Sequence, residues 1–138
     1  MATAAPRSPN LQRNYRQPLD FASFAADTTI KFDSCKLHSI RVDRVWLSLP
    51  AGLVANASNF CTFKLVKNAA TVMASWSTVT GGAPGTGTIG VNGAVDFLLT
   101  ATLADRFLAD GDTLSLFVDI TGTLTVPLGR IVAEGVEL

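Results

Sequence analysis

Apolar and polar residues alternate along most of the chain from residue 28 onward, which is the pattern of half-buried β-strands. Turn-forming residues such as Pro50-Ala51-Gly52 and Asp110-Gly111-Asp112 separate the alternating runs. The main runs span residues 28–32, 36–49, 59–68, 71–79, 89–104, 113–120 and 126–138. Helical periodicity is almost absent, and only residues 105–109 favour a single helical turn. We therefore predict an all-β fold, an antiparallel β-sandwich of about eight strands with a jelly-roll-like arrangement.

The long run at residues 36–49 contains an irregularity. Its apolar residues fall into two sets of opposite parity, Ile40 and Val42 in the first, and Val45, Leu47 and Leu49 in the second. A β-bulge near residues 43–44 would place both sets on the core face, because one extra residue exchanges inward and outward positions. In the last run, Pro127 indicates that the strand starts at a sheet edge or at a bulge.

The first 27 residues differ from the rest of the chain. Three prolines and three arginines interrupt any periodic pattern, yet the segment also holds several large apolar residues. A disordered leader and a docking arm are both compatible with this composition, and the large apolar residues favour the arm. We predict an extended N-terminal arm at residues 1–27 and a sandwich domain at residues 28–138. The arm residues predicted to contact another subunit or a partner are Arg7, Leu11, Arg13, Tyr15, Arg16, Leu19, Phe21 and Phe24.

Composition narrows the classes of partner. The formal net charge is zero and the folded region has no basic patch, so we do not expect nucleic acid as a partner. A membrane span is not expected either, because no run of about 18 apolar residues occurs. Apolar residues make up 48% of the chain, which favours burial of some surface against a partner, most simply a second copy. The N-terminus lacks the apolar core of a secretory signal, so Cys35 and Cys61 are expected as buried free thiols.

The sequence offers little for catalysis or metal binding. His38 is the one histidine, and no nucleophile motif accompanies it. Three residues, His38, Cys35 and Cys61, lack the spacing of a zinc site, and residues 110–112 are interpreted as a hairpin turn rather than a calcium loop. The glycines at residues 81–87 have no lysine or helix after them, so we interpret this stretch as a flexible loop. We predict no enzyme activity, no catalytic residue, no cofactor and no metal.

The two tryptophans are candidates for recognition. Trp46 lies between Val45 and Leu47, so its side chain should point away from the core. An outward tryptophan either fills a protein interface or stacks on a sugar. We favour an interface for Trp46, because sugar platforms normally use several aromatic residues and Tyr15 is the one tyrosine.

Three stretches of the sandwich region together resemble a known family. They are "IRVDRVWLSL" with the following "CTFKLVKN", "LADGDTLSLFV" at residues 108–118, and "GTLTVPLGRIVAE" at residues 122–134. This combination resembles the small jelly-roll head decoration (cement) proteins of tailed bacteriophages. Residues 108–114 and 127–131 occupy the places of that family's turn-and-strand signatures.

The resemblance implies a structural virion protein on the outer surface of the capsid, assembled in the host cytoplasm. It implies a homotrimer that clamps neighbouring subunits of the major capsid protein, with the arm reaching across the shell. The alternative is a phage fibre domain or another receptor- or glycan-binding β-sandwich. A small coat protein that binds RNA through the arm is a weaker alternative, because three arginines are few for that role.

Overall fold

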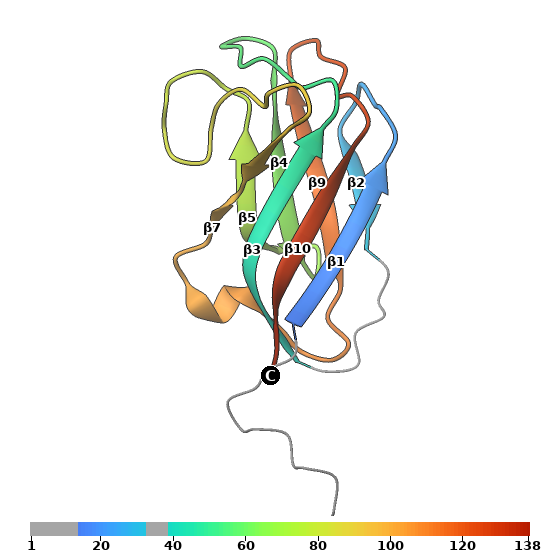
Figure 1. Cartoon of the computed structure of the whole chain (residues 1–138), viewed down its shortest axis with the longest axis vertical. Coiled ribbons are helices and arrows are strands. Elements are labelled where there is room, and N and C mark those ends of the chain that lie inside the picture. The colour runs from blue at the N-terminus through green and yellow to red at the C-terminus, as the bar shows by residue number, and fades with distance from the viewer. Residues whose placement is uncertain (1–13, 33–38) are drawn as a thin grey trace, which may run out of the picture.

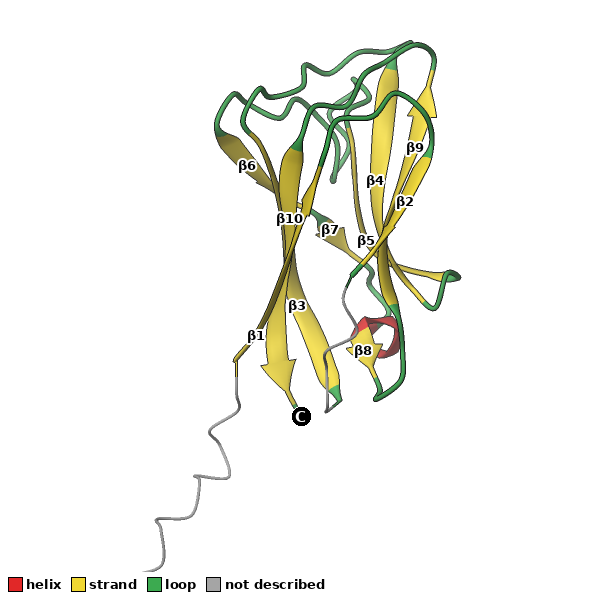
Figure 2. Ribbon diagram, turned by 90° about the vertical axis from the view of Figure 1, so that its right-hand side faces the viewer, coloured by secondary structure: helices red, strands yellow, loops and turns green. Residues whose placement is uncertain are grey.

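The protein forms a sandwich of two antiparallel sheets in a computed structural model that describes residues 14–32 and 39–138 (Figures 1 and 2). The first sheet has the order β1-β10-β3-β6, and β8 also pairs with β3. The second sheet has the order β2-β9-β4-β5-β7. The strands of the first sheet are β1 (Asn14–Phe21), β3 (Ile40–Leu49), β6 (Gly93–Asp96), β8 (Phe107–Leu108) and β10 (Gly129–Glu137). Those of the second are β2 (Thr28–Lys31), β4 (Phe60–Lys67), β5 (Thr71–Ser77), β7 (Leu98–Leu99) and β9 (Leu114–Thr121).

The connections have jelly-roll character. The β4–β5 hairpin joins neighbours in one sheet, whereas the other connections between described strands cross from one sheet to the other. The first and last long strands, β1 and β10, lie side by side, as do β2 and β9. The predicted all-β sandwich is confirmed.

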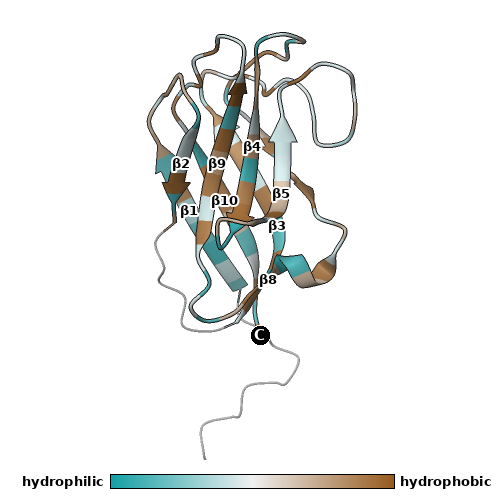
Figure 3. Ribbon diagram, turned by 180° about the vertical axis from the view of Figure 1, so that it is seen from behind, coloured by the Kyte–Doolittle hydropathy of each residue, from teal (hydrophilic) through white to brown (hydrophobic). Residues whose placement is uncertain are grey.

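The core lies between the two inner faces, where alternate residues of each strand meet (Figure 2). Its largest fully buried side chains include Phe63, Ile40, Leu47, Leu65, Met73 and Leu116. Figure 3 shows the corresponding alternation of hydrophilic and hydrophobic bands along the strands. Val45, Leu47 and Leu49, which the sequence alternation assigned to the core face, are fully buried.

The predicted bulge in β3 is confirmed. Glu134 pairs with Arg44 and the next residue, Gly135, pairs with Val42, so Asp43 is the extra residue on β3. Val42 and Val45 are consequently both buried although their sequence parity differs. The bulge is what allows the whole length of β3 to present apolar residues to the core.

The run at residues 89–104, predicted as one strand, is divided between the two sheets. β6 pairs with β3 in the first sheet, and β7 pairs with β5 in the second. Phe97 lies at the crossing, where its backbone N–H donates to Val45 O (2.8 Å) and its ring packs near Phe63. The helical turn is a 3-10 helix at Leu103–Arg106, slightly before the predicted residues 105–109.

The predicted division at residues 27 and 28 requires correction. Residues 14–21 are not an arm but the strand β1, which pairs along its whole length with β10. Tyr15, Leu19 and Phe21 alternate along this strand and pack on the core side. Pro18 is accommodated because β1 is an edge strand, where a missing N–H need not break a ladder. Residues 1–13 lie outside the described residues.

Pro127 does not mark an edge strand. It lies in the connection before β10, and β10 itself runs between β1 and β3. Because Pro127 precedes the strand, it removes no backbone hydrogen bond from the ladders that β10 forms with β1 and β3.

The Cys61 thiol is buried in the core, as predicted, whereas Cys35 lies outside the described residues. Burial raises the pKa of Cys61, and the Thr78 hydroxyl, 3.8 Å from the sulfur, partly opposes this effect. The resulting pKa is about 11. Since the unfolded thiol loses its proton at lower pH, the stability associated with the protonated thiol is present below about pH 9 and is lost as the pH rises towards 11.

We therefore expect the free energy of unfolding to fall by roughly 2 kcal/mol more in the wild type than in Cys61→Ala over this pH range. Denaturant titrations at intervals between these pH values test the expectation. Parallel curves for the two proteins would contradict it.

Candidate interaction surface

The outer face of the first sheet carries charged and apolar side chains in register. We call it the charged face. Strand pairing places its side chains in three rows across β1, β10 and β3. The rows are Arg16–Glu134–Arg44, then Pro18–Val132–Trp46, then Asp20–Arg130–Ser48.

Ion pairs connect the arginines of this face to carboxylates on neighbouring strands. Arg130 Nε donates to Asp20 Oδ1 (2.6 Å) and its Nη2 donates to Asp20 Oδ2 (3.1 Å). This pairing holds the pKa of Asp20 below its usual value. Arg44 Nε donates to Asp96 Oδ1 (2.7 Å), and its Nη1 donates to Glu134 Oε1 (3.4 Å). Because such exposed pairs contribute little stability, their main effect is to fix where each charge lies.

Trp46 occupies the centre of the charged face, on the side predicted from its neighbours. Its flanking residues on β3 are fully buried, whereas Trp46 is half-buried on the outer surface. Val132, its partner on β10, is fully buried, and the Arg44 guanidinium lies 5.9 Å from the ring centroid. The indole N–H is buried and has no hydrogen-bond partner within the described part of the chain. The interface role of Trp46 stays a prediction.

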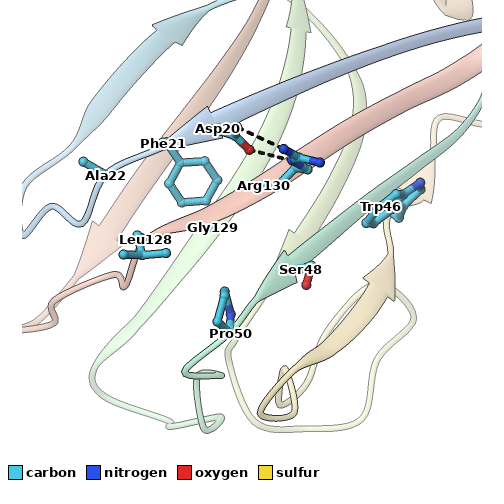
Figure 4. Close-up of a pocket in the computed structure, with 9 residues that line it drawn as sticks. All are labelled: Asp20, Phe21, Ala22, Trp46, Ser48, Pro50, Leu128, Gly129 and Arg130. Carbon is cyan, nitrogen blue, oxygen red and sulfur yellow. Dashed lines mark hydrogen bonds and ion pairs between the residues drawn. The ribbon is translucent and has the colours of Figure 1, made fainter.

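A groove of about 550 Å³ opens between Trp46 and the upper end of β1 (Figure 4). Its lining comes from β1, β3, β10 and the residues that follow or precede them: Asp20, Phe21, Ala22, Trp46, Ser48, Pro50, Leu128, Gly129 and Arg130. The lining is mainly apolar, with the Asp20–Arg130 pair on one side. Sequence reasoning missed this groove because it exists only where β1 lies beside β10.

The structure separates the residues predicted to contact a partner. Arg16 lies on the charged face, with its Nε 3.6 Å from Glu134 Oε2. Tyr15, Leu19, Phe21 and Phe24 instead pack against the sandwich core. Phe21 is only 7% exposed, and its ring lies 6.0 Å from that of Phe24.

Phe21 is buried in this protein's own core, which corrects its predicted partner contact, whereas Tyr15, Leu19 and Phe24 are only partly buried and their partner contacts stay predictions. For Tyr15, burial raises the pKa to about 12. Arg7, Leu11 and Arg13 lie outside the described residues, so their predicted contacts stay predictions.

A second surface is formed by the connections at one end of the sandwich, the upper end in Figure 1. We call it the loop end. Its four connections are residues 22–27, 50–59, 78–92 and 122–128. Asp27 is their one charged residue, although charged residues make up 16% of the chain. Val54 (76% exposed), Val91 (71%) and Leu128 (58%) project from three of the four connections.

Hydrogen bonds tie the four connections of the loop end together. Short antiparallel bridges join Phe24 to Val126 and Leu53 to Ile89. The Asn59 side chain accepts a bond from Thr123 N (2.8 Å). The loop end is therefore a continuous surface rather than four separate loops.

The glycine-rich stretch, predicted as flexible, is anchored at several points. Ser77 N donates to Gly85 O and Gly87 N donates to Ser77 O, each at 2.9 Å. Trp76 Nε1 also donates to Gly87 O (3.1 Å). Trp76 pairs with the buried Phe63, so it faces the interior rather than a ligand.

The residues considered for chemistry do not form a recognisable centre within the described ranges. His38 and Cys35 lie outside them, and residues 14–32 and 39–138 hold no cluster of three or more metal-ligating side chains. Residues 110–112 form a turn, in which Ala109 N donates to Asp112 Oδ2 (2.8 Å), but it is not the predicted hairpin, because the flanking strands β8 and β9 lie in different sheets. Among the described residues, no helix is long and apolar enough to cross a membrane.

Comparison with known proteins identifies no family, so a proposal about function rests on the features of this chain. No protein-family model, no curated protein and no solved structure matches the chain.

Proposed function

We propose that the protein is a structural virion protein, a capsid decoration protein that binds the outer surface of a phage head and clamps neighbouring major capsid subunits. The observation that carries the proposal is the loop end. Protein interfaces are depleted of charged residues at their centres, and this surface combines near absence of charge with exposed Val54 and Val91. The jelly-roll connectivity is compatible with the family that the sequence resembles.

A homotrimer would strengthen such attachment. A single loop end offers a small contact, and small contacts bind weakly. Three loop ends held in one particle bind almost as one unit, because each attached copy raises the effective concentration of the others. Detachment then requires several contacts to break together, which is the behaviour needed in a clamp.

The alternative, a glycan-binding module, receives less support from the tryptophans. Arg44 lies over the Trp46 ring, and Trp76 faces the interior and binds the glycine-rich stretch. Stacking on a sugar needs an accessible ring face. Trp76 is therefore not available to a sugar, and Trp46 alone does not provide a platform of several aromatic rings.

Charged substitutions at the loop end should weaken shell binding. We expect Val54→Asp and Val91→Asp each to reduce affinity for expanded shells of the protein's own virus at least about tenfold, since each would bury an unpaired charge. Co-sedimentation with such shells measures the effect. Leu103→Asp is the matched control, because Leu103 is also exposed (48%) but lies in the 3-10 helix at the other end. Equal binding by all three variants and the wild type would refute the role of the loop end.

A further inference from the structure

We propose that the groove beside Trp46 binds residues 5–11 of a second copy of the chain, the segment "APRSPNL". This inference concerns the contact between copies and does not depend on binding to a shell.

The groove has the chemistry that proline-rich segments require. Pro6 and Pro9 have the P-x-x-P spacing, and such segments in polyproline II conformation dock into grooves lined by aromatic and apolar side chains. Here Trp46, Pro50 and Leu128 provide apolar walls of that kind (Figure 4). Leu128 is 58% exposed, so a docked proline would cover apolar surface that now faces solvent.

Polar groups of the groove complement the rest of the segment. Asp20 offers a carboxylate to Arg7, the basic residue between the two prolines. The Arg130 guanidinium beside Asp20 and the Ser48 hydroxyl on β3 also line the groove and can donate hydrogen bonds to backbone carbonyls, which remain unpaired in a polyproline II segment. The bidentate pair between Arg130 and Asp20 holds both charged groups in place before the segment arrives.

The length of the chain disfavours the protein's own segment as the occupant. β1 runs from Asn14 towards the groove, so Asp20 lies about 20 Å and Ala22 about 26 Å from Asn14 at roughly 3.3 Å per residue. Pro9 precedes Asn14 by five residues and reaches at most about 18 Å. Pro6 reaches at most about 29 Å, and only with a fully extended chain that spends no residue on reversing direction. Placing both prolines along the groove from the same copy would therefore require a fully extended reversal immediately before β1, so we assign the segment to another copy.

Donation from one copy to the next gives a head-to-tail contact. Each copy then donates one segment and receives another, and such heterologous contacts form closed rings when the rotation between copies permits. In a closed ring of three copies, every groove holds a segment and every segment is docked in a groove. The groove thus supplies a physical basis for the proposed homotrimer.

Disulfide trapping between two different variants tests the contact directly. One full-length chain carries Ser8→Cys, between the prolines, and the other carries Ser48→Cys, in the groove. After mixing and mild oxidation, we expect a covalent heterodimer on non-reducing gels. The control mixes Ser8→Cys with Ser75→Cys, because Ser75 is a half-buried serine on the second sheet. Unsubstituted chains, which keep Cys35 and Cys61, give the background.

The chemistry of the segment is tested in the same assay. Adding Pro6→Ala and Pro9→Ala to the Ser8→Cys chain should lower the yield of heterodimer at least about fivefold. Equal yields with Ser48→Cys and Ser75→Cys, no heterodimer above background, or no response to the proline substitutions would each overturn the proposal. Because no shell is present, failure here is distinguishable from failure of the decoration function.

Discussion

A chain that starts at Thr28 should not fold cooperatively, whereas a chain that starts at Arg13 should unfold like the full-length protein. The first deletion removes β1 and leaves its eight partner residues on β10 unpaired. It also removes Phe21, Leu19 and Tyr15, which pack on the core, and leaves the residues beneath them open to water. The second deletion keeps all of these contacts.

The expected loss is large compared with the stability of a typical domain. Burial of one large apolar side chain contributes about 1.5–3 kcal/mol, so three of them contribute on the order of 5 kcal/mol before the newly exposed partners are counted. A domain of this size typically has 5–15 kcal/mol in total. Thermal unfolding followed by near-UV circular dichroism compares the two deletions with the full chain. A cooperative transition of the Thr28 chain near that of the full chain would show that β1 is dispensable.

Gly135→Ala should be the most damaging single methyl addition in the first sheet, destabilising the protein by roughly 3 kcal/mol. Gly135 lies opposite the β3 bulge, where an added Cβ would overlap the backbone carbonyl of Arg41 and crowd Val42 Cα. Both neighbours belong to the ladder between β3 and β10, so neither moves without breaking hydrogen bonds. Chemical denaturation measures the change in free energy of unfolding.

Gly90→Ala is the matched control for this substitution. An added Cβ at Gly90 has no neighbour within 4 Å, so we expect a change within about 0.5 kcal/mol. Equal stability of Gly135→Ala and Gly90→Ala would contradict the described register at the bulge.

Sequence alternation predicted most of the fold because each main strand has one buried face. The parity change between Val42 and Val45 was sufficient to predict the bulge, and the neighbours of Trp46 were sufficient to predict its outward side chain. β1 was missed although Tyr15, Leu19 and Phe21 share one parity. Pro18 and the polar residues around it outweighed that signal, since an edge strand tolerates proline and exposes half of its residues.

The candidate surfaces were harder to predict from the sequence than the strands. The scarcity of charge in residues 50–59 and 78–92 can be read directly, but the meeting of these segments at one end depends on the crossing connections. The groove depends on β1 pairing with β10, a contact between residues more than a hundred positions apart. Local patterns carry no information on such long-range pairing, whereas they do carry the alternation of a single strand.

Cryo-electron microscopy of expanded shells saturated with the full-length protein shows directly whether, and by which surface, the protein attaches to a capsid. We expect extra density on the outer surface of the shell, into which the sandwich fits with the loop end, including Val54 and Val91, against the capsid subunits. Shells that gain no density, or density in which the loop end points away from the shell, would contradict this expectation.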